Sequence, residues 1–310
     1  MLKISHLLRT AARKLLHKIP YVKRLADFQA HYEKCSCFAP GHFYSPLMDP
    51  TTLLPTLQKS RRERLPTEIQ GIDWNLGAQQ QLLQDLSHLN ETLPFAAEKK
   101  SGLRYYFENG YYSYTDAIVL FFLMQHLKPK RIIEVGSGFS SALMLDTRQI
   151  LGRNAVDITF IEPYPDRLHS LLLTDDYQST QILQVPVQEV ELDFFESLQA
   201  NDWLFIDSSH VAKTNSDVNY LLLEVLPRLR QGVWVHFHDI FYPFEYPGDW
   251  IAKGYNWNEV YFLRAFLTFN SSYKIRLFAD FIHKCHPDFY APFPLAYKNH
   301  GGALWLEKRA

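Results

Sequence analysis

Short apolar runs alternate with longer segments of helical periodicity between residues 131 and 238. Strands that alternate with helices in this way form βαβ units, which build a parallel sheet with helices on both faces. The sequence therefore predicts a doubly wound α/β fold in this part of the chain. The expected strands lie at 131–135, 157–161, 180–185, 203–206 and 232–238, and the expected helices at 165–173, 192–200 and 214–229, with one more directly after the first strand.

A glycine-rich turn follows the first expected strand. The chain reads Glu134-Val-Gly-Ser-Gly138 there and continues into a helical pattern. Gly136 and Gly138 allow the backbone to turn sharply and to approach a ligand closely, and Ser140 is suited to cap the helix. This sequence of strand, glycine turn and helix N-terminus is typical of a loop that binds a nucleotide cofactor. An ordinary glycine turn within a βα unit is the alternative.

The residues around the glycines indicate which cofactor is bound. A dinucleotide-binding loop has a third glycine at the position that Ser141 occupies here. Glu134 precedes Gly136 by two residues, and a carboxylate there suits a cation better than a phosphate. S-adenosylmethionine (SAM) carries an ammonium and a sulfonium and has no phosphate. The second strand ends in Glu162, which is placed to accept hydrogen bonds from ribose hydroxyls. We therefore expect SAM as the cofactor, bound by Glu134, Gly136, Gly138, Ser140, Ser141 and Glu162.

Acidic residues and histidines follow the fourth and fifth expected strands. Asp207 ends the fourth strand, with His210 three residues later, and His238 and Asp239 end the fifth. Ligands of open α/β sheets bind beyond the carboxyl ends of the strands, so these side chains are expected at one site, where Asp207 also contacts the cofactor. His236 alternates with His238 along the strand and is expected to be a core histidine with its hydrogen bonds satisfied.

Two chemical interpretations of this site stay open. In the first, Asp207, His238 and Asp239 hold a divalent metal ion that binds hydroxyls of an acceptor, and His210 is the general base. In the second there is no metal, and His210 or His238 removes a proton while a neighbouring aspartate fixes its tautomer. A purely structural alternative is that these groups only satisfy loop amides.

Aromatic residues provide further candidates. A sulfonium is attracted to aromatic faces, so Tyr112 and Tyr114 are candidates for the methyl-donor pocket, unless they simply pack. The loop at 35–50 is rich in proline and contains His42 and Tyr44, with Ser45 beside them. Because loops on a rigid scaffold often carry function, we expect these residues to act as a lid or to contact the acceptor. A surface linker is the alternative.

Three motifs resemble a known family: Glu134-Val-Gly-Ser-Gly138, Phe205-Ile-Asp-Ser-Ser-His210 and His236-Phe-His-Asp-Ile240. They are similar to motifs of class I SAM-dependent methyltransferases, in particular a bacterial branch related to metal-dependent sugar O-methyltransferases. Segments 40–46 and 110–116 are similar to elements of the same branch. The resemblance implies a Rossmann-like SAM-binding domain at 101–310 with an antiparallel C-terminal strand and an N-terminal helical cap at 1–100. It also implies a bacterial enzyme of secondary metabolism.

The resemblance bears on the metal as well. Related sugar O-methyltransferases have an aspartate at the end of the fourth strand, a histidine three residues later and two acids after the fifth strand. This chain has His238 and Asp239 in place of the two acids. A metal held here would therefore be one that accepts nitrogen ligands, in preference to Mg²⁺.

Composition and charge exclude several other classes of protein. The net charge of −1 gives no reason to expect a nucleic-acid partner, which normally requires a clearly basic face, and no apolar run approaches the length of a membrane helix, about 20 residues. Cys35, Cys37 and Cys285 cannot form a disulfide framework, so a cytoplasmic location is expected. The stretch 1–34 predicts a basic amphipathic helix, broken at Pro20, that either packs on its own domain or contacts a partner or a membrane surface. A homodimer is compatible with the sequence.

The function that these features favour is SAM-dependent methylation of a small molecule, on oxygen, with His210 as the base. A second hypothesis is an intramolecular SAM cyclase, in which the amine of SAM attacks its own γ-carbon and releases methylthioadenosine and azetidine-2-carboxylate. Such a reaction would need SAM alone and no acceptor. A third hypothesis is an inactive SAM-fold scaffold protein, although such a protein would have no need of Glu134, Glu162, Asp207 and His210.

Overall fold

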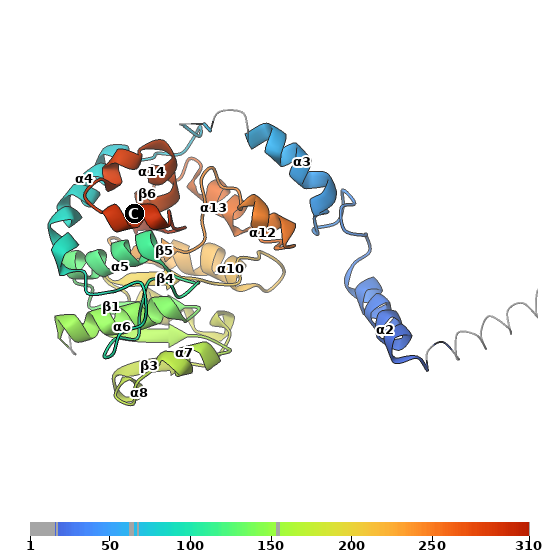
Figure 1. The fold of residues 1–310 in the computed structure, drawn as a ribbon, viewed down its shortest axis with the longest axis horizontal. Coiled ribbons are helices and arrows are strands. Elements are labelled where there is room, and N and C mark those ends of the chain that lie inside the picture. The colour runs from blue at the N-terminus through green and yellow to red at the C-terminus, as the bar shows by residue number, and fades with distance from the viewer. Residues whose placement is uncertain (1–15, 17, 62–64, 67, 153–155, 310) are drawn as a thin grey trace, which may run out of the picture. The chain divides into compact units, whose positions relative to one another are not determined.

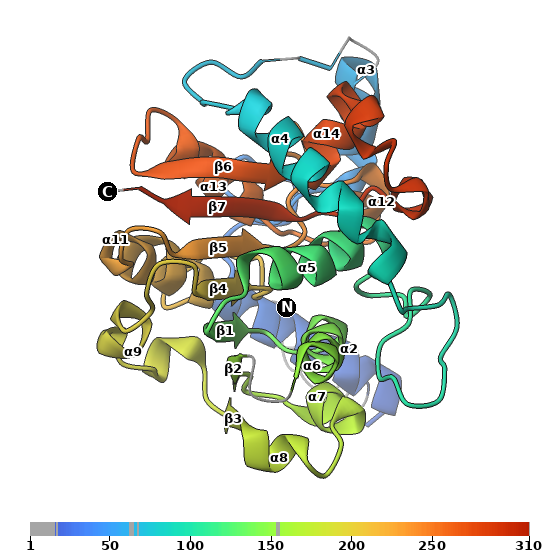
Figure 2. The ribbon, with the colours of Figure 1, turned by 90° about the vertical axis from the view of Figure 1, so that its left-hand side faces the viewer.

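In the computed structural model, seven strands form one sheet in the order β3-β2-β1-β4-β5-β7-β6 (Figure 2). The pairs from β3 to β5 are parallel, and β7 runs antiparallel between β5 and β6. The α/β sheet with an antiparallel C-terminal strand is therefore confirmed. The strands are β1 (Arg131–Val135), β2 (Asp157–Ile161), β3 (Thr180–Leu183), β4 (Trp203–Ile206), β5 (Trp234–Phe237), β6 (Tyr273–Phe278) and β7 (Leu304–Lys308).

Helices flank this sheet. α5 contacts α4 and α6, and Figure 2 shows α5 and α6 in front of the strands. The expected helix at 214–229 is divided, because a π-helical segment, η3, separates α10 from α11. The helices are α4 (Leu76–Leu86), α5 (Tyr114–Leu127), α6 (Phe139–Leu151), α7 (Asp166–Leu171), α8 (Asp176–Ser179), α9 (Leu192–Glu196), α10 (Asp217–Asn219), η3 (Tyr220–Val225), α11 (Leu226–Arg228), α13 (Glu259–Leu267) and α14 (Ala279–Cys285), with short 3₁₀ turns η1 (Ser87–Thr92), η2 (Val187–Glu189), η4 (Pro287–Tyr290) and η5 (Pro294–Lys298).

The core lies around the central strands, which are buried on both faces. Every residue of β4 and β5 is buried, and the rings of Trp203 and Trp305 meet edge to face at 5.0 Å. α5 is buried continuously from Tyr114 to Met124. A helix that is covered on nearly all sides needs no polar face, which explains why most of its residues are apolar. Rigid strands and buried helices therefore position the loops at the carboxyl ends of the strands.

The structure describes residues 16, 18–61, 65–66, 68–152 and 156–309, which group into two units (Figure 1). Unit 1 is Met1–Glu63 with Gly248–Asn256; it contains α2 (Pro20–Cys35) and α3 (Pro50–Arg61), and α3 contacts α12 (Gly248–Ala252). Unit 2 is Arg64–Pro247 with Trp257–Ala310 and contains the sheet. Residues 65–100, which the sequence assigns to the helical cap, group with the sheet.

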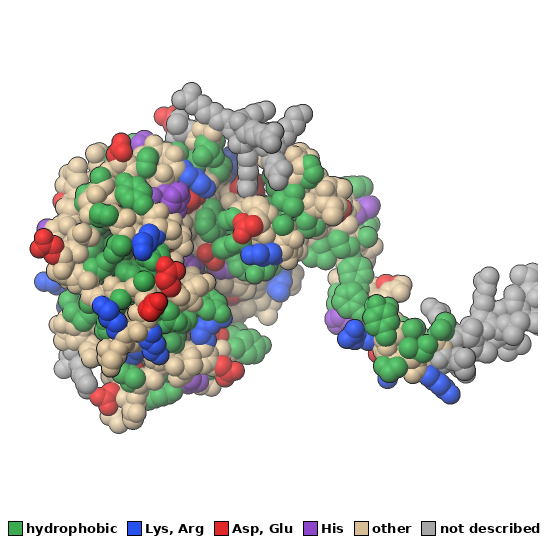
Figure 3. All heavy atoms as spheres, in the orientation of Figure 1, with side chains coloured by type: hydrophobic (Ala, Val, Ile, Leu, Met, Phe, Trp, Pro, Cys, Tyr) green, Lys and Arg blue, Asp and Glu red, His purple; other side chains and the backbone are tan. Residues whose placement is uncertain are grey.

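The N-terminal predictions are only partly covered by the structure. Residues 1–15 of the expected basic helix lie outside the described residues, and α2 begins at Pro20, where proline is tolerated because the first N–H of a helix needs no partner. The helices of the described parts include none that is long and apolar enough to cross a membrane. The three cysteines are free. Basic and acidic side chains are interspersed on the face of unit 2 that Figure 3 shows.

Candidate active site

The glycine turn after β1 lies against the turn after β4. Gly136 has a φ of +82°, and a Cβ atom added there would lie 1.8 Å from the carbonyl oxygen of Asp207. Its N–H donates to the Ile161 carbonyl at the end of β2, at 3.0 Å. Position 136 therefore requires glycine both for its left-handed backbone and for space. Gly138 has extended backbone, and a Cβ there would meet only the Arg167 side chain, at 3.3 Å.

The start of α6 fixes the buried Glu134 carboxyl group. Gly138, rather than the expected Ser140, is the N-cap, and its N–H donates to the Ser141 hydroxyl at 2.9 Å. The hydroxyls of Ser140 and Ser141 both donate to Glu134, whose side chain is fully buried. Burial raises the pKa of Glu134 to about 8, against the lowering effect of the two hydroxyl groups. Glu134 thus stabilises the loop through the two serine hydroxyls. Its predicted contact with SAM stays a prediction.

Two adjoining cavities open at the ends of β1, β2 and β4, and both are lined by Gly136, Glu162 and Asp207. One has a volume of about 330 Å³ and extends to His210, His238 and Asp239; we call it the catalytic cleft. The other, of about 520 Å³, extends over the loop after β3. The Glu162 carboxylate accepts the N–H groups of Ser137 at 3.1 Å and Tyr164 at 2.8 Å, so it sits at the junction of the two.

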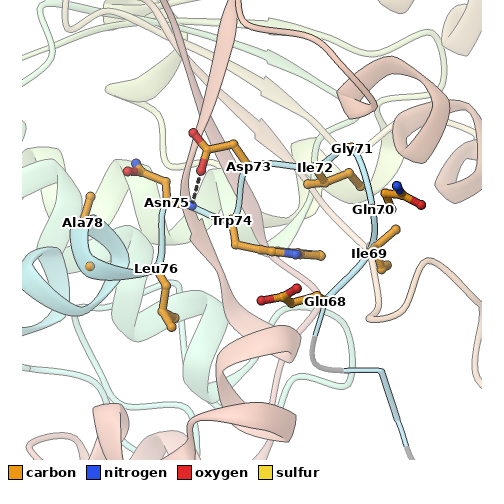
Figure 4. Close-up of a pocket in the computed structure, with 11 residues that line it drawn as sticks. Glu68, Ile69, Gln70, Gly71, Ile72, Asp73, Trp74, Asn75, Leu76 and Ala78 are labelled. Atoms are coloured by element: carbon orange, nitrogen blue, oxygen red, sulfur yellow. Dashed lines mark hydrogen bonds between the residues drawn. The ribbon is translucent and has the colours of Figure 1, made fainter.

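A larger hollow lies elsewhere in unit 2. It has a volume of about 910 Å³ and is lined by residues 68–78, with the Trp74 ring extending across it (Figure 4). The dashed line in Figure 4 marks a hydrogen bond within a turn, which the Asn75 N–H donates to Asp73 at 3.0 Å. None of the site residues that the sequence predicts line this hollow, so the chemistry is assigned to the strand ends.

His210 is held between three carboxylates. Its Nδ1 is 2.8 Å from Glu259, and its Nε2 is 3.5 Å from Asp207 and 3.6 Å from Asp239. His210 has a φ of +60°, and its carbonyl oxygen accepts the N–H groups of Asn258 and Glu259 at the start of α13. The same helix therefore fixes both the backbone and the ring of His210.

His238 also lines the catalytic cleft. Its Nε2 is 3.4 Å from Asp239, and its Nδ1 is 4.0 Å from Asp116. Asp116 in turn accepts hydrogen bonds from the backbone N–H groups of Gly302 and Ala303. These hydrogen bonds join α5 to the start of β7. His238 Nδ1 is buried and has no hydrogen-bond partner among the described residues.

The carboxylates determine the protonation of both histidines. Burial by itself would lower the pKa of His210, but hydrogen bonds to Asp207 and Glu259 raise it well above the usual value. Burial likewise opposes the rise in the pKa of His238, which Asp239 and Asp207 produce. In return, His238 and His210 lower the pKa of Asp207, against the opposite effect of its partial desolvation. The carboxylates therefore favour the charged imidazoles, whereas burial raises the pKa of Asp239 and of Glu259.

Asp207, His238 and Asp239 form a possible metal site. One ligand atom from each lies within 4.8 Å of the other two. Asp207 and Asp239 keep 32% and 19% of their side-chain surface exposed, so their oxygens can be reached from the cleft. Two carboxylates and one imidazole are a ligand set that divalent transition metals accept. The described residues thus fit a divalent cation.

The remaining predicted residues are placed as follows. Tyr112 lines the catalytic cleft, with its ring 5.0 Å from that of His238. Tyr114 does not line it; its hydroxyl donates to Glu108 and its ring stacks on Phe107. His42 and Tyr44 belong to unit 1, where the Tyr44 N–H donates to the His42 ring. Their predicted roles stay predictions.

His236 is a core residue, as expected, but its hydrogen bonds are not satisfied. Its ring stacks on Phe205 at 3.9 Å, and neither ring nitrogen has a hydrogen-bond partner in the described parts of the chain. Burial lowers the pKa of His236 well below the usual value, so the ring is neutral. The ring is packed by stacking, and the neutral form costs less to bury than the charged form would.

Sequence reasoning missed residues that complete the site: Glu259, Asp116, Trp257 and Arg167. Glu259 left a signal, because it adjoins the buried stripe of Val260, Leu263 and Leu267 on α13 and is itself buried. An acid beside an apolar stripe of a helix needs a buried partner. The identity of that partner, His210, is visible only in the structure.

The strand order and the turn geometry define a Rossmann-like α/β protein with a glycine turn of the type found in nucleotide-binding loops. Residues 133–240 match a family model described as a methyltransferase domain. The chain is 35% identical over 167 residues to an uncharacterized protein of Archaeoglobus fulgidus. The aligned part covers 53% of this chain and 75% of that protein. The match identifies residues 133–240, which contain the glycine turn and strands β2 to β5, as a methyltransferase domain.

Solved structures of methyltransferases are also similar. The SAH-bound methyltransferase PaMTH1 of Podospora anserina is 13% identical, with 86% of this chain and 99% of that chain covered and a TM-score of 0.42. The O-methyltransferase TomG of Streptomyces achromogenes, involved in tomaymycin synthesis and solved with SAM, is 13% identical, with 85% and 100% covered and a TM-score of 0.42.

Proposed function

We propose that this protein transfers the methyl group of SAM to an oxygen atom of a small-molecule acceptor, with His210 as the general base. The observation that carries this proposal is the position of His210. Its ring lines the catalytic cleft beside the glycine turn, and Glu259 holds it from the other side at 2.8 Å. A base that is oriented by a buried carboxylate and faces the donor site suits proton removal from an acceptor hydroxyl.

The two cavities suit the two halves of SAM. Glu162 at their junction is the acceptor for the ribose hydroxyls, and the cavity over the loop after β3 has room for the adenine. The methionyl half would then extend past Gly136 into the catalytic cleft. There the ring of Tyr112 and the carboxylate of Asp207 can face the sulfonium and the ammonium.

The reaction needs alignment and one proton transfer. The acceptor oxygen attacks the methyl carbon in line with the breaking S–CH₃ bond, its proton passes to His210 Nε2, and S-adenosylhomocysteine (SAH) leaves. Donation from Nδ1–H to Glu259 fixes the tautomer that leaves Nε2 free to accept this proton. The ammonium and the sulfonium of SAM offset the carboxylates around His210, which makes the neutral base easier to form.

Asp207, His238 and Asp239 are the residues that would hold a divalent metal ion, as their geometry fits one. Such an ion would polarise an acceptor hydroxyl and lower its pKa. Asp116 faces the buried Nδ1 of His238 and would keep Nε2 directed at the cleft.

The metal site gives a direct prediction. We expect Mn²⁺ to bind the purified protein at a single site, and Asp239→Asn to abolish this binding because it removes one of two carboxylate ligands. Electron paramagnetic resonance of free Mn²⁺ measures it. Asp166→Asn, at the exposed start of α7, is the matched control and should bind as the wild type does. Equal binding by Asp239→Asn and wild type would show that the metal, if any, lies elsewhere.

The product distinguishes the candidate reactions. The protein is incubated with SAM alone and with a panel of hydroxyl compounds, each with and without chelator, and the nucleoside is identified by mass spectrometry. We expect SAM to persist alone and to give SAH with an acceptor. Methylthioadenosine formed without an acceptor would instead establish SAM cyclisation. Binding of SAM without turnover across a broad panel would favour the scaffold hypothesis.

Glu162 gives a prediction for cofactor affinity. Glu162→Gln loses the charge that accepts the ribose hydroxyls, so we expect SAH to bind about tenfold more weakly. Isothermal titration calorimetry with SAH measures the change. The control is Glu189→Gln, an exposed glutamate in η2, which should leave the affinity unchanged. If both variants bind SAH equally, Glu162 is not the ribose acceptor.

A further inference from the structure

The carboxylates of the catalytic cleft cannot complement every charged group of SAM. Glu162, Asp207 and Asp239 supply negative charge, which suits the ribose, the ammonium and the sulfonium. SAM also carries an α-carboxylate on its methionyl group, and a carboxylate needs a cation or N–H donors. Among the described residues that line the cleft, Arg167 is the sole Lys or Arg.

Arg167 lies where the methionyl end of SAM would reach. It is the second residue of α7, and its guanidinium carbon lies 4.1 Å from the centre of the Tyr111 ring. A Cβ added to Gly138 would be 3.3 Å from Arg167 Cδ and 3.8 Å from one of its terminal nitrogens. The guanidinium therefore lies beside the first residues of α6, and it lines the same cleft as Asp207.

The N–H donors of Arg167 are available to a ligand. Its side chain makes no hydrogen bond or ion pair with any residue that the structure describes. The guanidinium stacks on the Tyr111 ring, and its charge helps to lower the pKa of Asp207. The contact with Tyr111 holds the plane of the guanidinium and leaves its edge open. The first turn of α6 adds the partial positive charge of a helix N-terminus at the same place. The Arg167 guanidinium therefore combines a position in the cleft, a positive charge and N–H donors that a ligand can reach.

We propose that Arg167 binds the α-carboxylate of the methionyl group of SAM and SAH. This rests on the proposed SAM-dependent function. With the ribose at Glu162 and the ammonium near Asp207, the carboxylate is the one charged group of SAM left for a cation. A planar guanidinium matches a carboxylate with two parallel hydrogen bonds, whereas a lysine would offer only a point charge. Arg167 therefore distinguishes SAM from analogues that lack this carboxylate.

The test compares ligands that differ in that carboxylate. SAM and SAH carry it; decarboxylated SAM and methylthioadenosine do not. We expect Arg167→Gln to weaken the binding of SAM and SAH by about 10- to 100-fold and to change the binding of the other two by less than about threefold. Arg167→Lys should retain part of the preference for SAM. Arg167→Glu should reverse it, so that decarboxylated SAM binds more tightly than SAM. Isothermal titration calorimetry measures all four affinities.

The control is Arg230→Gln, which makes the same chemical change at an exposed arginine near the start of β5. It should leave all four affinities unchanged. Equal weakening of all four ligands by Arg167→Gln would overturn the proposal, because the residue would then only shape the cleft. No change with any ligand would overturn it as well. Wild-type protein that binds none of the four ligands would refute the proposed function itself. Wild-type protein that binds SAM, with a variant that keeps the preference for SAM, would refute only the role of Arg167.

Discussion

Gly136→Ala is expected to abolish SAM binding and to lower the thermal stability of the protein. The new methyl group would overlap the Asp207 carbonyl oxygen, at 1.8 Å, and the backbone there has a φ of +82°. The left-handed backbone alone costs about 1–2 kcal/mol for alanine. The overlap adds to this, because the turns after β1 and β4 must separate, and both line the two cavities. The measurements are the midpoint of thermal unfolding by circular dichroism and the affinity for SAH.

Gly102→Ala isolates the effect of backbone strain. Gly102 has a φ of +88°, but an added Cβ would meet no atom within 4 Å. We expect this variant to lose about 1–2 kcal/mol of stability and no SAH affinity. A Gly136→Ala protein with the unfolding midpoint and the SAH affinity of Gly102→Ala would show that the turn does not pack against the Asp207 carbonyl.

His210→Asn is expected to reduce methyl transfer by about 10²- to 10⁴-fold, the usual contribution of a general base. Asparagine tolerates the positive φ of this position, so the loop can keep its conformation. SAM binding should change by less than about threefold, because the cofactor contacts other residues. The measurement is the rate of SAH formation at saturating SAM, with an acceptor found in the product screen, alongside the SAH affinity of the same protein.

Glu259→Gln is the companion to this variant. Glutamine still accepts a hydrogen bond from His210 but carries no charge, so we expect a smaller loss of rate than in His210→Asn and an unchanged KM for SAM. If His210→Asn retains most of the wild-type rate while it binds SAH normally, another group removes the proton, and His238 would be the next residue to replace.

Local patterns in the sequence were sufficient to place the glycine turn and the acidic strand ends. The alternation of apolar runs and helices predicted the sheet, and the carboxyl ends of neighbouring parallel strands lie at one edge. Asp207, His210, His238 and Asp239 therefore had to come together, and the structure brings them within 3.4–3.6 Å of one another in pairs. The placement of these side chains succeeds because burial and turn geometry depend on residues that are close in sequence, and the roles assigned to them stay predictions.

Contacts between distant segments were decided by tertiary packing alone. Glu259 reaches His210 from a helix 49 residues later, and Asp116 reaches His238 from a helix that precedes the first strand. Arg167 lies beside Gly138 because α7 packs against α6. Periodicity shows that a face is buried but not which side chains meet there. Partners at long sequence separation depend on how whole elements pack, and that choice is made by the fold of the complete unit.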